Sequence, residues 1–482
     1  MRILLASSEV HPYSKSGGLA DMVGALAKAL GRAGHQVGLV TPLYAGILDR
    51  FPEIQRFNWW IDLPLGSGRV QASVWMLQPS PGLTIYFIDH PPFYGRAGLY
   101  GEAGHDYTDN PQRFILFSKC VVQLARYLPS QPEIVHAHDW QAGLAPIFIL
   151  HQKLTDGWMH VPRTLFTIHN LAYQGNFPRP AYDFTSLPLD YFNPNGLEFY
   201  GYMSCLKAGI VYSDLITTVS PRYAREITTE EFGCGLDAIL RQRQSSLVGI
   251  LNGVDYEEWS TDHNPRLPHP YSLRSLAGKA KTKADLQREF GLPPRADVPL
   301  FASITRLAEQ KGVDIQLGAL EEMLAADMQF ILLGSGSPYY ETAYRALQKR
   351  HSSKVAVQIG FNNTLAHHIE AGADFFLMPS RYEPCGLNQM YSLRYGTIPI
   401  VRITGGLDDS VADISEDLDG ADGIKFSEYS VRALAKAIRK ALVLYERPEL
   451  LKHYRKNGMK ADFSWDRTAQ DYVKAYQRAL AH

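Results

Sequence analysis

The chain has 482 residues, more than one hydrophobic core usually serves, so we expect two or three domains. Its formal net charge of -1 provides no positive field for a nucleic acid or an anionic membrane surface. No apolar run is long enough to span a bilayer, and the N-terminus lacks the basic region and cleavage site of a secretory signal. The four cysteines are widely spaced, which excludes a Cys-x-x-Cys zinc site and favours a reducing cytoplasm. We therefore expect a cytoplasmic protein without nucleic acid or membrane partners.

Short apolar runs alternate with helical patterns along both halves of the chain. Near-continuous apolar strands separated by helices are typical of parallel sheets covered on both faces, so the pattern predicts an α/β protein with two doubly wound domains. A polar interlude places the boundary near residues 244–252, between domains 1–247 and 248–461. Apolar residues at helical spacing predict a terminal helix within 462–482 that packs back on the first domain. The expected strands include 3–6, 37–40, 84–88, 134–135, 165–168 and 215–219 in the first half, and 247–251, 300–304, 330–333, 355–357, 375–378 and 398–401 in the second.

A glycine turn with a lysine follows the first apolar run. Lys15 precedes Gly17-Gly18, after which a helical pattern begins. Helix N-termini attract anions and glycine allows close approach of the backbone, so the turn predicts a phosphate site, with a tight turn and a solvated lysine as the alternative. The order differs from a P-loop, and the missing Gly-x-Gly-x-x-Gly disfavours a dinucleotide-dependent oxidoreductase. Gly405-Gly406 repeats the turn, which suggests that both halves direct helix ends at one ligand.

Polar residues and glycines follow nearly every expected strand. In open parallel sheets, ligands bind at the carboxyl ends of the strands. We therefore predict an active site at these ends, in a cleft between the two domains. The residues placed there are Lys15, 136–140, 169–175, 252–255, 306–312, 334–336, 360–361, 383–387 and 404–406.

Each candidate group has a functional and a structural interpretation. His136 and His138 alternate on a strand as metal ligands can, but no obvious third ligand accompanies them, so we expect no metal. Arg306 and Lys311 follow one strand and can neutralise a diphosphate, or form an ordinary surface pair. Glu383 follows another strand, where a carboxylate can hold sugar hydroxyls or serve only as a helix N-terminal charge.

Cys385 lies two residues after Glu383 and close to an expected helix start. A nearby helix N-terminus lowers a thiol pKa and favours the reactive thiolate. Free cysteines more often pack as small apolar residues. The sequence therefore leaves two interpretations, a redox-sensitive site residue and a buried, inert thiol.

Seven sequence blocks together resemble bacterial glycogen synthase and plant starch synthase. The blocks keep the order of that family and span nearly the whole chain, which makes their combination far more specific than any one block. They are 15–21 (KSGGLAD), 136–140 (HAHDW), 169–175 (HNLAYQG), 252–255 (NGVD), 306–312 (RLAEQKG), 379–387 (PSRYEPCGL) and 404–407 (TGGL).

The resemblance implies a GT-B glycosyltransferase with two Rossmann-like domains and an interdomain cleft. It implies transfer of glucose from ADP-glucose to the non-reducing 4-OH of an α-1,4-glucan with retention of configuration, without a cofactor or metal. The first domain would serve the acceptor and the second the nucleotide-sugar. Arg306 and Lys311 match residues that hold the diphosphate, His169 matches one that contacts the transferring glucose, Glu383 supports the developing positive charge, and Asp139 lies near the reacting centre.

The resemblance also implies a set of substrate-binding residues. Lys15 and Gly17-Gly18 match positions that serve the nucleotide-sugar, and Phe361 matches an aromatic residue that packs on the adenine. The remaining members of the implied set are Asp21, Asn252, Cys385, Gly386, Leu387, Gly405 and Gly406.

Three positions depart from the family pattern. Ser16 stands where many members have Thr or Val, 408–410 read Asp-Asp-Ser where Ala-Asp-Thr is common, and Tyr391 replaces the second glutamate of the broader retaining-transferase signature. Tyrosine at that position also occurs in glycogen synthases. The alternatives are another GT-B transferase, such as one that uses UDP-glucose or makes a disaccharide, and a glucan-binding protein without turnover. The intact candidate catalytic residues argue against the second.

Overall fold

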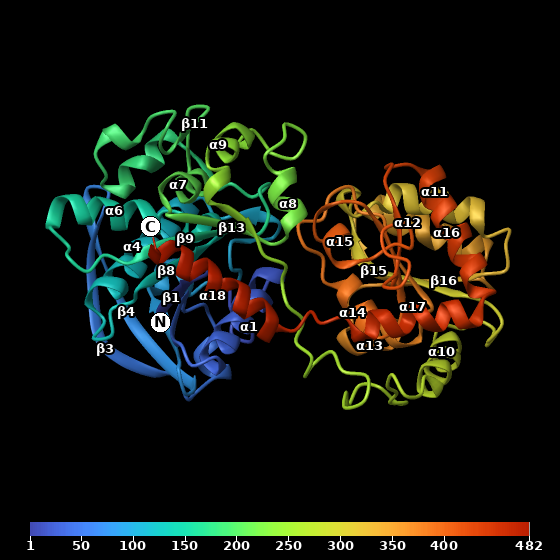
Figure 1. Ribbon diagram of the computed structural model, residues 1–482. Helices are drawn as coiled ribbons and strands as arrows, with labels where there is room; N and C mark the ends of the chain where they lie inside the picture. Colours follow the sequence, from blue (N-terminus) through green and yellow to red (C-terminus); the bar gives the residue numbers. More distant parts are fainter. Residues whose placement is uncertain (482) are drawn as a thin grey trace. The chain divides into compact units, whose positions relative to one another are not determined.

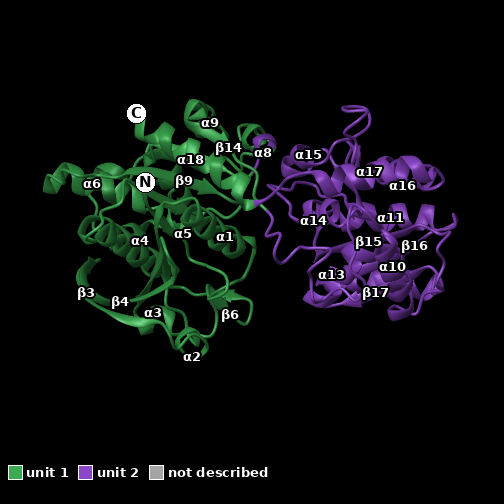
Figure 2. Ribbon diagram, turned by 60° about the horizontal axis from the view of Figure 1, so that its bottom comes forward, with its two compact units in different colours: residues 1–219, 224–253, 465–482 green, residues 220–223, 254–464 purple. Residues whose placement is uncertain are grey.

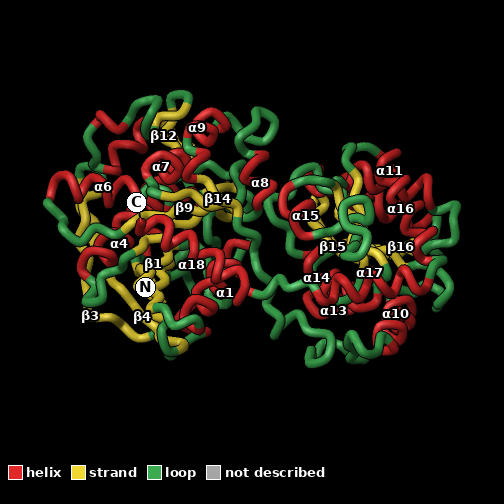
Figure 3. Tube along the Cα trace, viewed as in Figure 1, coloured by secondary structure: helices red, strands yellow, loops and turns green. Residues whose placement is uncertain are grey.

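The computed structural model describes residues 1–481 and divides into two compact units (Figure 1). Unit 1 comprises residues 1–219 and 224–253 together with the segment from Trp465 onward, and unit 2 comprises 220–223 and 254–464 (Figure 2). The last position of the expected terminal helix, residue 482, lies outside the described residues. In each unit, strands form the centre and helices cover them (Figure 3). None of the helices in 1–481 is both long and apolar enough to cross a membrane.

The sheet of unit 1 has nine strands in the order β14-β13-β9-β8-β1-β2-β5-β4-β3. The strands from β14 to β5 run parallel, whereas β4 and β3 extend the sheet antiparallel beyond β5. Chain order reverses between β1 and β8, which makes their carboxyl ends the topological switch point where ligands bind. The strands are β1 Arg2–Ala6, β2 Gln36–Pro42, β3 Gln55–Leu65, β4 Gly68–Ser80, β5 Leu83–Asp89, β8 Ile134–His138, β9 Arg163–Ile168, β13 Leu215–Thr218 and β14 Leu247–Gly249. Outside the main sheet lie a two-stranded sheet, β6 Gly101–Glu102 and β7 His105–Asp106, and a three-stranded sheet, β10 Asn176–Pro178, β11 Glu198–Phe199 and β12 Tyr202–Ser204.

Helices cover this sheet, and the C-terminal helix is one of them. Helix α18 contacts α1 and β9, and the Tyr476 hydroxyl reaches Nδ1 of His136 at 2.9 Å. The helices are α1 Gly18–Arg32, α2 Ile47–Arg50, α3 Pro91–Tyr94, α4 Asn110–Tyr127, α5 Asp139–Ala142, α6 Ala145–Asp156, α7 Cys205–Tyr212, α8 Pro221–Glu226, α9 Asp237–Gln242 and α18 Trp465–Ala481, with 3-10 turns Arg179–Thr185, Leu189–Tyr191 and Gln244–Ser246.

The apolar run 247–251 does not open the second domain, contrary to the sequence prediction. Its strand β14 pairs with β13 in parallel, with Ile216 opposite Leu247, and forms an edge of the unit 1 sheet. The preceding polar residues, expected to mark the boundary, form the end of α9 and a 3-10 turn within unit 1. The division between the units therefore falls later, between Gly253 and Val254.

Unit 2 contains one six-stranded parallel sheet in the order β17-β16-β15-β18-β19-β20. In chain order this is 3-2-1-4-5-6, the Rossmann arrangement, with its switch point between β15 and β18. The strands are β15 Leu300–Leu307, β16 Gln329–Gly336, β17 Val355–Ile359, β18 Phe375–Met378, β19 Ile398–Arg402 and β20 Ile424–Phe426, and the helices are α10 Ala277–Glu289, α11 Val313–Met323, α12 Pro338–Arg350, α13 Asn363–Gly372, α14 Asn388–Arg394, α15 Gly405–Ser410, α16 Val431–Tyr445 and α17 Pro448–Lys460, with a 3-10 turn at Glu309–Lys311.

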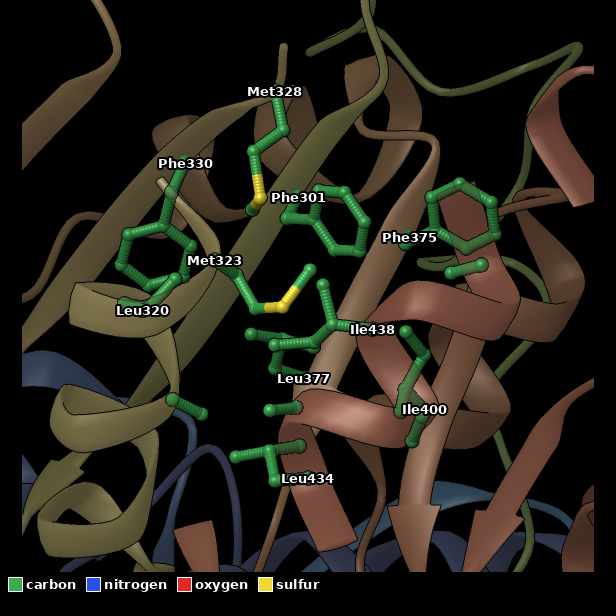
Figure 4. Packing of buried hydrophobic residues seen from close by; sticks show 14 of the residues in the cluster. Phe301, Leu320, Met323, Met328, Phe330, Phe375, Leu377, Ile400, Leu434 and Ile438 are labelled. Carbon is green, nitrogen blue, oxygen red and sulfur yellow. The ribbon is translucent and has the colours of Figure 1, made fainter. Parts of the chain in front are cut away.

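Apolar side chains fill both faces of the unit 2 sheet. On one face, Phe301, Phe375 and Leu377 pack under helices α11 and α16, which contribute Met323 and Ile438 (Figure 4). A second cluster on the other face joins the strands to α10 and α13. Complete burial of such a side chain contributes about 1.5–3 kcal/mol, so these layers hold the strand ends at the switch point in place.

Candidate active site

The first glycine turn leaves open space in front of a helix. Gly18 is the first residue of α1 and Gly17 is its N-cap. Neither glycine has a positive φ, and a Cβ added to either would meet no atom within 4 Å. The packing of unit 1 therefore does not require glycine at these positions. Open space at a helix N-terminus is what close approach of an anionic ligand needs.

Glu9 is a member of this turn that the sequence analysis missed. Its buried carboxylate accepts hydrogen bonds from the Ser16 amide, from the Ser16 hydroxyl at 2.6 Å and from the Gly17 amide at 3.2 Å. The Tyr100 hydroxyl donates to the same carboxylate at 2.7 Å. The Gly17 amide, which was expected to face a phosphate, is therefore occupied by the protein itself. Within 1–481, the Gly18 amide has no such partner.

Lys15 and Asp21, both expected site residues, form an ion pair with 2.7 Å between Nζ and Oδ2. The lysine side chain is 50% exposed and the aspartate 35%. An ion pair this exposed contributes only about 0–1 kcal/mol, so an incoming diphosphate can replace Asp21 as the partner of the Lys15 ammonium at a small cost in free energy. The pair keeps the positive charge of Lys15 beside the open turn.

Asp139 lies directly after β8, at the switch point of the unit 1 sheet, and is tied to the strand alongside. Its Oδ1 accepts a hydrogen bond from the His169 amide at 2.8 Å. Burial raises the pKa of Asp139 to about 7, and the negative charge of Glu9 acts in the same direction. The residue also has a φ of 55°, a left-handed conformation that costs a non-glycine residue about 1–3 kcal/mol and is common at functional sites.

Three histidines lie near Asp139: His136 and His138 are on β8, and His169 directly follows β9. Nδ1 of His138 is 3.1 Å from Nε2 of His169, and Nε2 of His138 is buried without a partner among residues 1–481. Burial lowers the pKa of His136 and of His169 to about 3, and that of His138 well below its usual value, so all three rings are neutral at pH 7. His169 can therefore orient a ligand by hydrogen bonding but not by charge.

The metal interpretation of His136 and His138 finds no support in the described part of the chain. No group of three His, Cys, Asp or Glu side chains in 1–481 is arranged to hold a metal ion. His136 is fully buried between Tyr476 and Thr167, with 2.5 Å between Nε2 and the threonine hydroxyl. It is a hydrogen-bonded core residue that joins α18 to the sheet.

In unit 2, Lys311 and Glu383 form one ion pair at the switch point. The ammonium follows β15, the carboxylate follows β18, and Nζ lies 2.6 Å from Oε2. Ser380 donates a hydrogen bond to the same oxygen at 3.1 Å. The glutamate side chain is only 8% exposed, whereas the lysine is 21% exposed. The residue expected to hold a diphosphate and the residue expected to support the sugar are thus neighbours.

Arg306 is the other expected cation of unit 2. It lies at the exposed end of β15, where its guanidinium donates to Gln310 at 3.1 Å. None of the carboxylates in residues 1–481 forms an ion pair with it. Its full charge is therefore available on the same strand end as Lys311.

The second glycine turn differs from the first. Gly405 has a φ of +44°, and a Cβ there would overlap the carbonyl oxygen of Glu383. A Cβ on Gly406 would overlap the Cys385 carbonyl, and the Gly406 amide donates to the carbonyls of Glu383 and Pro384 at 3.2 and 3.1 Å. These glycines allow α15 to pack against the Glu383 loop. The expectation that both glycine turns present free amides to one ligand does not hold for Gly406.

The other residues of the Glu383 loop are shaped by packing. Cys385 is 6% exposed, which fits the inert-thiol alternative better than a reactive thiolate. Gly386 has a φ of +71°, a conformation that favours glycine, and Leu387 is the N-cap of α14. Tyr391, the departure from the retaining-transferase signature, stacks on Trp259 with ring centroids 3.7 Å apart.

Two further expected residues lie at strand ends. Phe361 follows β17 and is 79% exposed, so its ring is accessible to a planar ligand such as a nucleobase. Asn252 is a buried residue of unit 1 whose Oδ1 has no partner among 1–481.

The chain is similar to known proteins along its whole length. Residues 2–242 match the starch synthase catalytic domain, and residues 287–461 match the glycosyl transferases group 1. A protein named glycogen synthase from Anaeromyxobacter sp. (strain Fw109-5) is 48% identical over 485 residues, covering 100% of both chains. The chain belongs to the glycogen and starch synthase family. Another glycogen synthase, from Koribacter versatilis (strain Ellin345), is 43% identical and covers 99% of this chain and 98% of its own.

Solved structures of similar proteins agree with this membership. The catalytic domain of starch synthase IV from Arabidopsis thaliana, bound to ADP and acarbose, matches with a TM-score of 0.88 and 31% identity over 100% of this chain and 99% of its own. Sucrose-phosphate synthase from Thermosynechococcus elongatus shares the fold, with a TM-score of 0.62 and 18% identity over 100% of this chain and 99% of its own. The expected GT-B fold and the expected glycosyltransferase class are confirmed.

Proposed function

We propose that this glycosyltransferase elongates an α-1,4-glucan by transferring glucose from ADP-glucose to the non-reducing 4-OH, with retention of the anomeric configuration. Membership of the glycogen and starch synthase family supports the glucan as the acceptor. The ADP and acarbose bound to the Arabidopsis starch synthase IV support a nucleoside diphosphate and a saccharide as ligands of this chain.

The Lys311–Glu383 pair carries the proposal. Cleavage of the bond between glucose C1 and the phosphate oxygen leaves positive charge on the sugar and adds negative charge to the diphosphate. A cation and a carboxylate 2.6 Å apart at the switch point can stabilise these opposite charges together. Arg306 adds a second cation at the same strand end.

The unit 1 residues are proposed to serve the sugar and the acceptor. Asp139 fixes the loop that carries His169, whose neutral ring can hydrogen-bond a sugar hydroxyl. The Gly18 amide and Lys15 are proposed to contact the donor. In the front-face mechanism that we favour, the acceptor 4-oxygen bonds to C1 as the phosphate leaves, and the hydroxyl proton moves to a phosphate oxygen.

We further propose that the reaction needs no metal or cofactor and takes place in the cytoplasm. The cations Lys15, Arg306 and Lys311 supply positive charge for the diphosphate. All four cysteines are free thiols, which suits a reducing compartment.

The donor preference decides between this proposal and the nearest alternative. Transfer of radiolabelled glucose to glycogen is measured with ADP-glucose and with UDP-glucose at equal concentrations. We expect incorporation with ADP-glucose to exceed that with UDP-glucose by at least about tenfold, which corresponds to about 1.4 kcal/mol. Faster transfer from UDP-glucose would favour the UDP-dependent alternative, and absence of transfer from both would favour a binding protein without turnover.

A further inference from the structure

His138 contacts His169 through one ring nitrogen and leaves its other nitrogen without a partner. Its ring is fully buried at the carboxyl end of β8, against the ring of His136 at a centroid distance of 4.1 Å. Nδ1 of His138 lies 3.1 Å from Nε2 of His169, and Nε2 of His138 has no hydrogen-bond partner in the described part of the chain. Because a neutral imidazole has one donor and one acceptor nitrogen, these two observations together restrict where the protons lie.

Only one assignment of protons to this pair avoids a buried N–H group without an acceptor. If His169 donated from Nε2, whether neutral or charged, Nδ1 of His138 would accept and the proton of His138 would lie on the enclosed Nε2. A positive charge on His138 would also place a proton there. Buried N–H groups without an acceptor are rare, because they lose their hydrogen bond to water. His138 therefore carries its proton on Nδ1 and donates it to His169.

The same contact determines where the proton of His169 lies. Its Nε2 accepts from His138, so the proton of the neutral ring is on Nδ1. His169 is only partly buried, and its Nδ1 is open to the solvent and forms no hydrogen bond within residues 1–481. The His169 amide donates to Asp139 at 2.8 Å, which fixes the backbone that carries the ring. The open side of the ring therefore presents an N–H donor.

This tautomer of His169 needs a partner that holds it. Neutral histidine side chains in water favour the Nε2–H form, and the hydrogen bond made by one nitrogen decides which form a protein selects. A donor that is fixed before the substrate binds needs no rearrangement during the reaction. A sugar hydroxyl that accepts from such a donor keeps its own proton for a different acceptor, so its orientation is defined.

We propose that His138 is a positioning residue that holds His169 in the Nδ1–H tautomer, so that His169 donates a hydrogen bond to a hydroxyl oxygen of the transferring glucose. The inference rests on the proposed function for the contact between His169 and the sugar. Because His138 is enclosed by the protein, it acts through His169 and does not touch the substrate. His136, on the same strand, remains a core residue.

The positions of the protons can be measured without substrate. The full chain is labelled with 15N-histidine, and long-range proton–nitrogen correlation spectra at neutral pH distinguish protonated from unprotonated ring nitrogens. The chain has 16 histidines, so the signals of His169 and His138 are assigned from the spectra of His169→Gln and His138→Leu. We expect a protonated Nδ1 and an unprotonated Nε2 in both residues of the wild type.

Two variants of His138 separate this role from simple packing. Leucine removes the donor, whereas asparagine places an amide N–H group where Nδ1 was. In His138→Leu, His169 should change to the Nε2–H form and kcat/KM for ADP-glucose should fall about tenfold, at the lower end of what partners that orient a functional histidine contribute. His138→Asn should retain the Nδ1–H form of His169 and most of the activity. His160→Leu, a control at an exposed histidine of unit 1, should match the wild type in both measurements.

Three results would overturn the inference. They are a proton on Nε2 of His169 in the wild type, an unchanged tautomer of His169 in His138→Leu, and equal losses of activity in the leucine and asparagine variants. The wild-type spectrum decides the question even if a variant of His138 does not fold, because His169→Gln alone assigns the His169 signals. The spectra need no turnover. Failure of this inference is therefore distinguishable from failure of the proposed function, which would abolish glucose transfer in the wild type.

Discussion

Replacing Asp139 with asparagine is expected to stabilise unit 1 increasingly as the pH rises. The folded-state pKa of this aspartate is raised from 3.8 to about 7 by burial, with a smaller contribution from Glu9. Between these two values the folded state binds more protons than the unfolded state, so the contribution of Asp139 to stability falls from about pH 4 to about pH 7 and is constant above. Asparagine keeps an oxygen for the His169 amide and tolerates the positive φ, but it has no charge to bury.

The magnitude follows from the pKa shift. At about 1.36 kcal/mol per pKa unit, a rise from 3.8 to about 7 corresponds to roughly 4 kcal/mol. Because the side chain retains partial contact with the solvent, we expect about 2–4 kcal/mol in total. About 1.5–3 kcal/mol of this difference between Asp139→Asn and the wild type should develop between pH 5 and pH 8.

Urea unfolding followed by tryptophan fluorescence measures this difference. Six of the seven tryptophans, all except Trp259, belong to unit 1 and report on it. Glu370 and Asp422 also have raised pKa values, but they titrate equally in both proteins and cancel in the comparison. The more stable variant should transfer glucose more slowly. A stability difference that does not change with pH, or that shrinks as the pH rises, would refute the raised pKa of Asp139.

Four further predictions concern the candidate site. Lys311→Ala and Arg306→Ala should each lower kcat by about 10²–10³, and near-normal steady-state turnover would show that these cations are ordinary surface charges. Glu383→Gln should keep the fold, as checked by circular dichroism, and lose activity; unchanged kcat/KM would remove its proposed role, and unfolding would indicate a structural charge. EDTA should leave the transfer rate unchanged, whereas a loss that one divalent metal restores would contradict metal independence. Glu9→Gln should lower kcat/KM for ADP-glucose at least about tenfold, because the Glu9 carboxylate holds the glycine turn and each hydrogen bond to a charged group contributes about 1.5–3 kcal/mol. Glu53→Gln, a control at an exposed glutamate, should leave kcat/KM unchanged.

The alternation of apolar runs and helical patterns along the chain was sufficient to predict two doubly wound parallel sheets. Apolar strands such as 300–304 and 375–378 are buried on both faces, and this is visible in composition alone. The domain boundary was misplaced because β14 is also an apolar strand following a polar stretch. Which sheet such a strand joins depends on its partner β13, and pairing across about thirty residues leaves no local signal.

The sequence predicted which residues belong to the candidate site, but not which of them contact one another. Strand ends indicated Lys311 and Glu383 separately, whereas their ion pair depends on β15 and β18 being neighbours across the switch point. Glu9 was missed because a single glutamate after a strand carries no pattern, and its contacts with Ser16 and Gly17 come from the folding back of the loop. The two glycine turns look alike in sequence, and only the crowding around Gly405 separates them.

The most direct test of the central claim is the product formed from ADP-glucose and a defined maltoheptaose. The account predicts products longer by whole glucose units, with one ADP released for each unit, in mass spectra of the mixture. The added units should be removed by an exo-hydrolase specific for α-1,4 linkages at the non-reducing end. Release of free glucose without elongation, or transfer only to a monosaccharide or sugar phosphate, would contradict it.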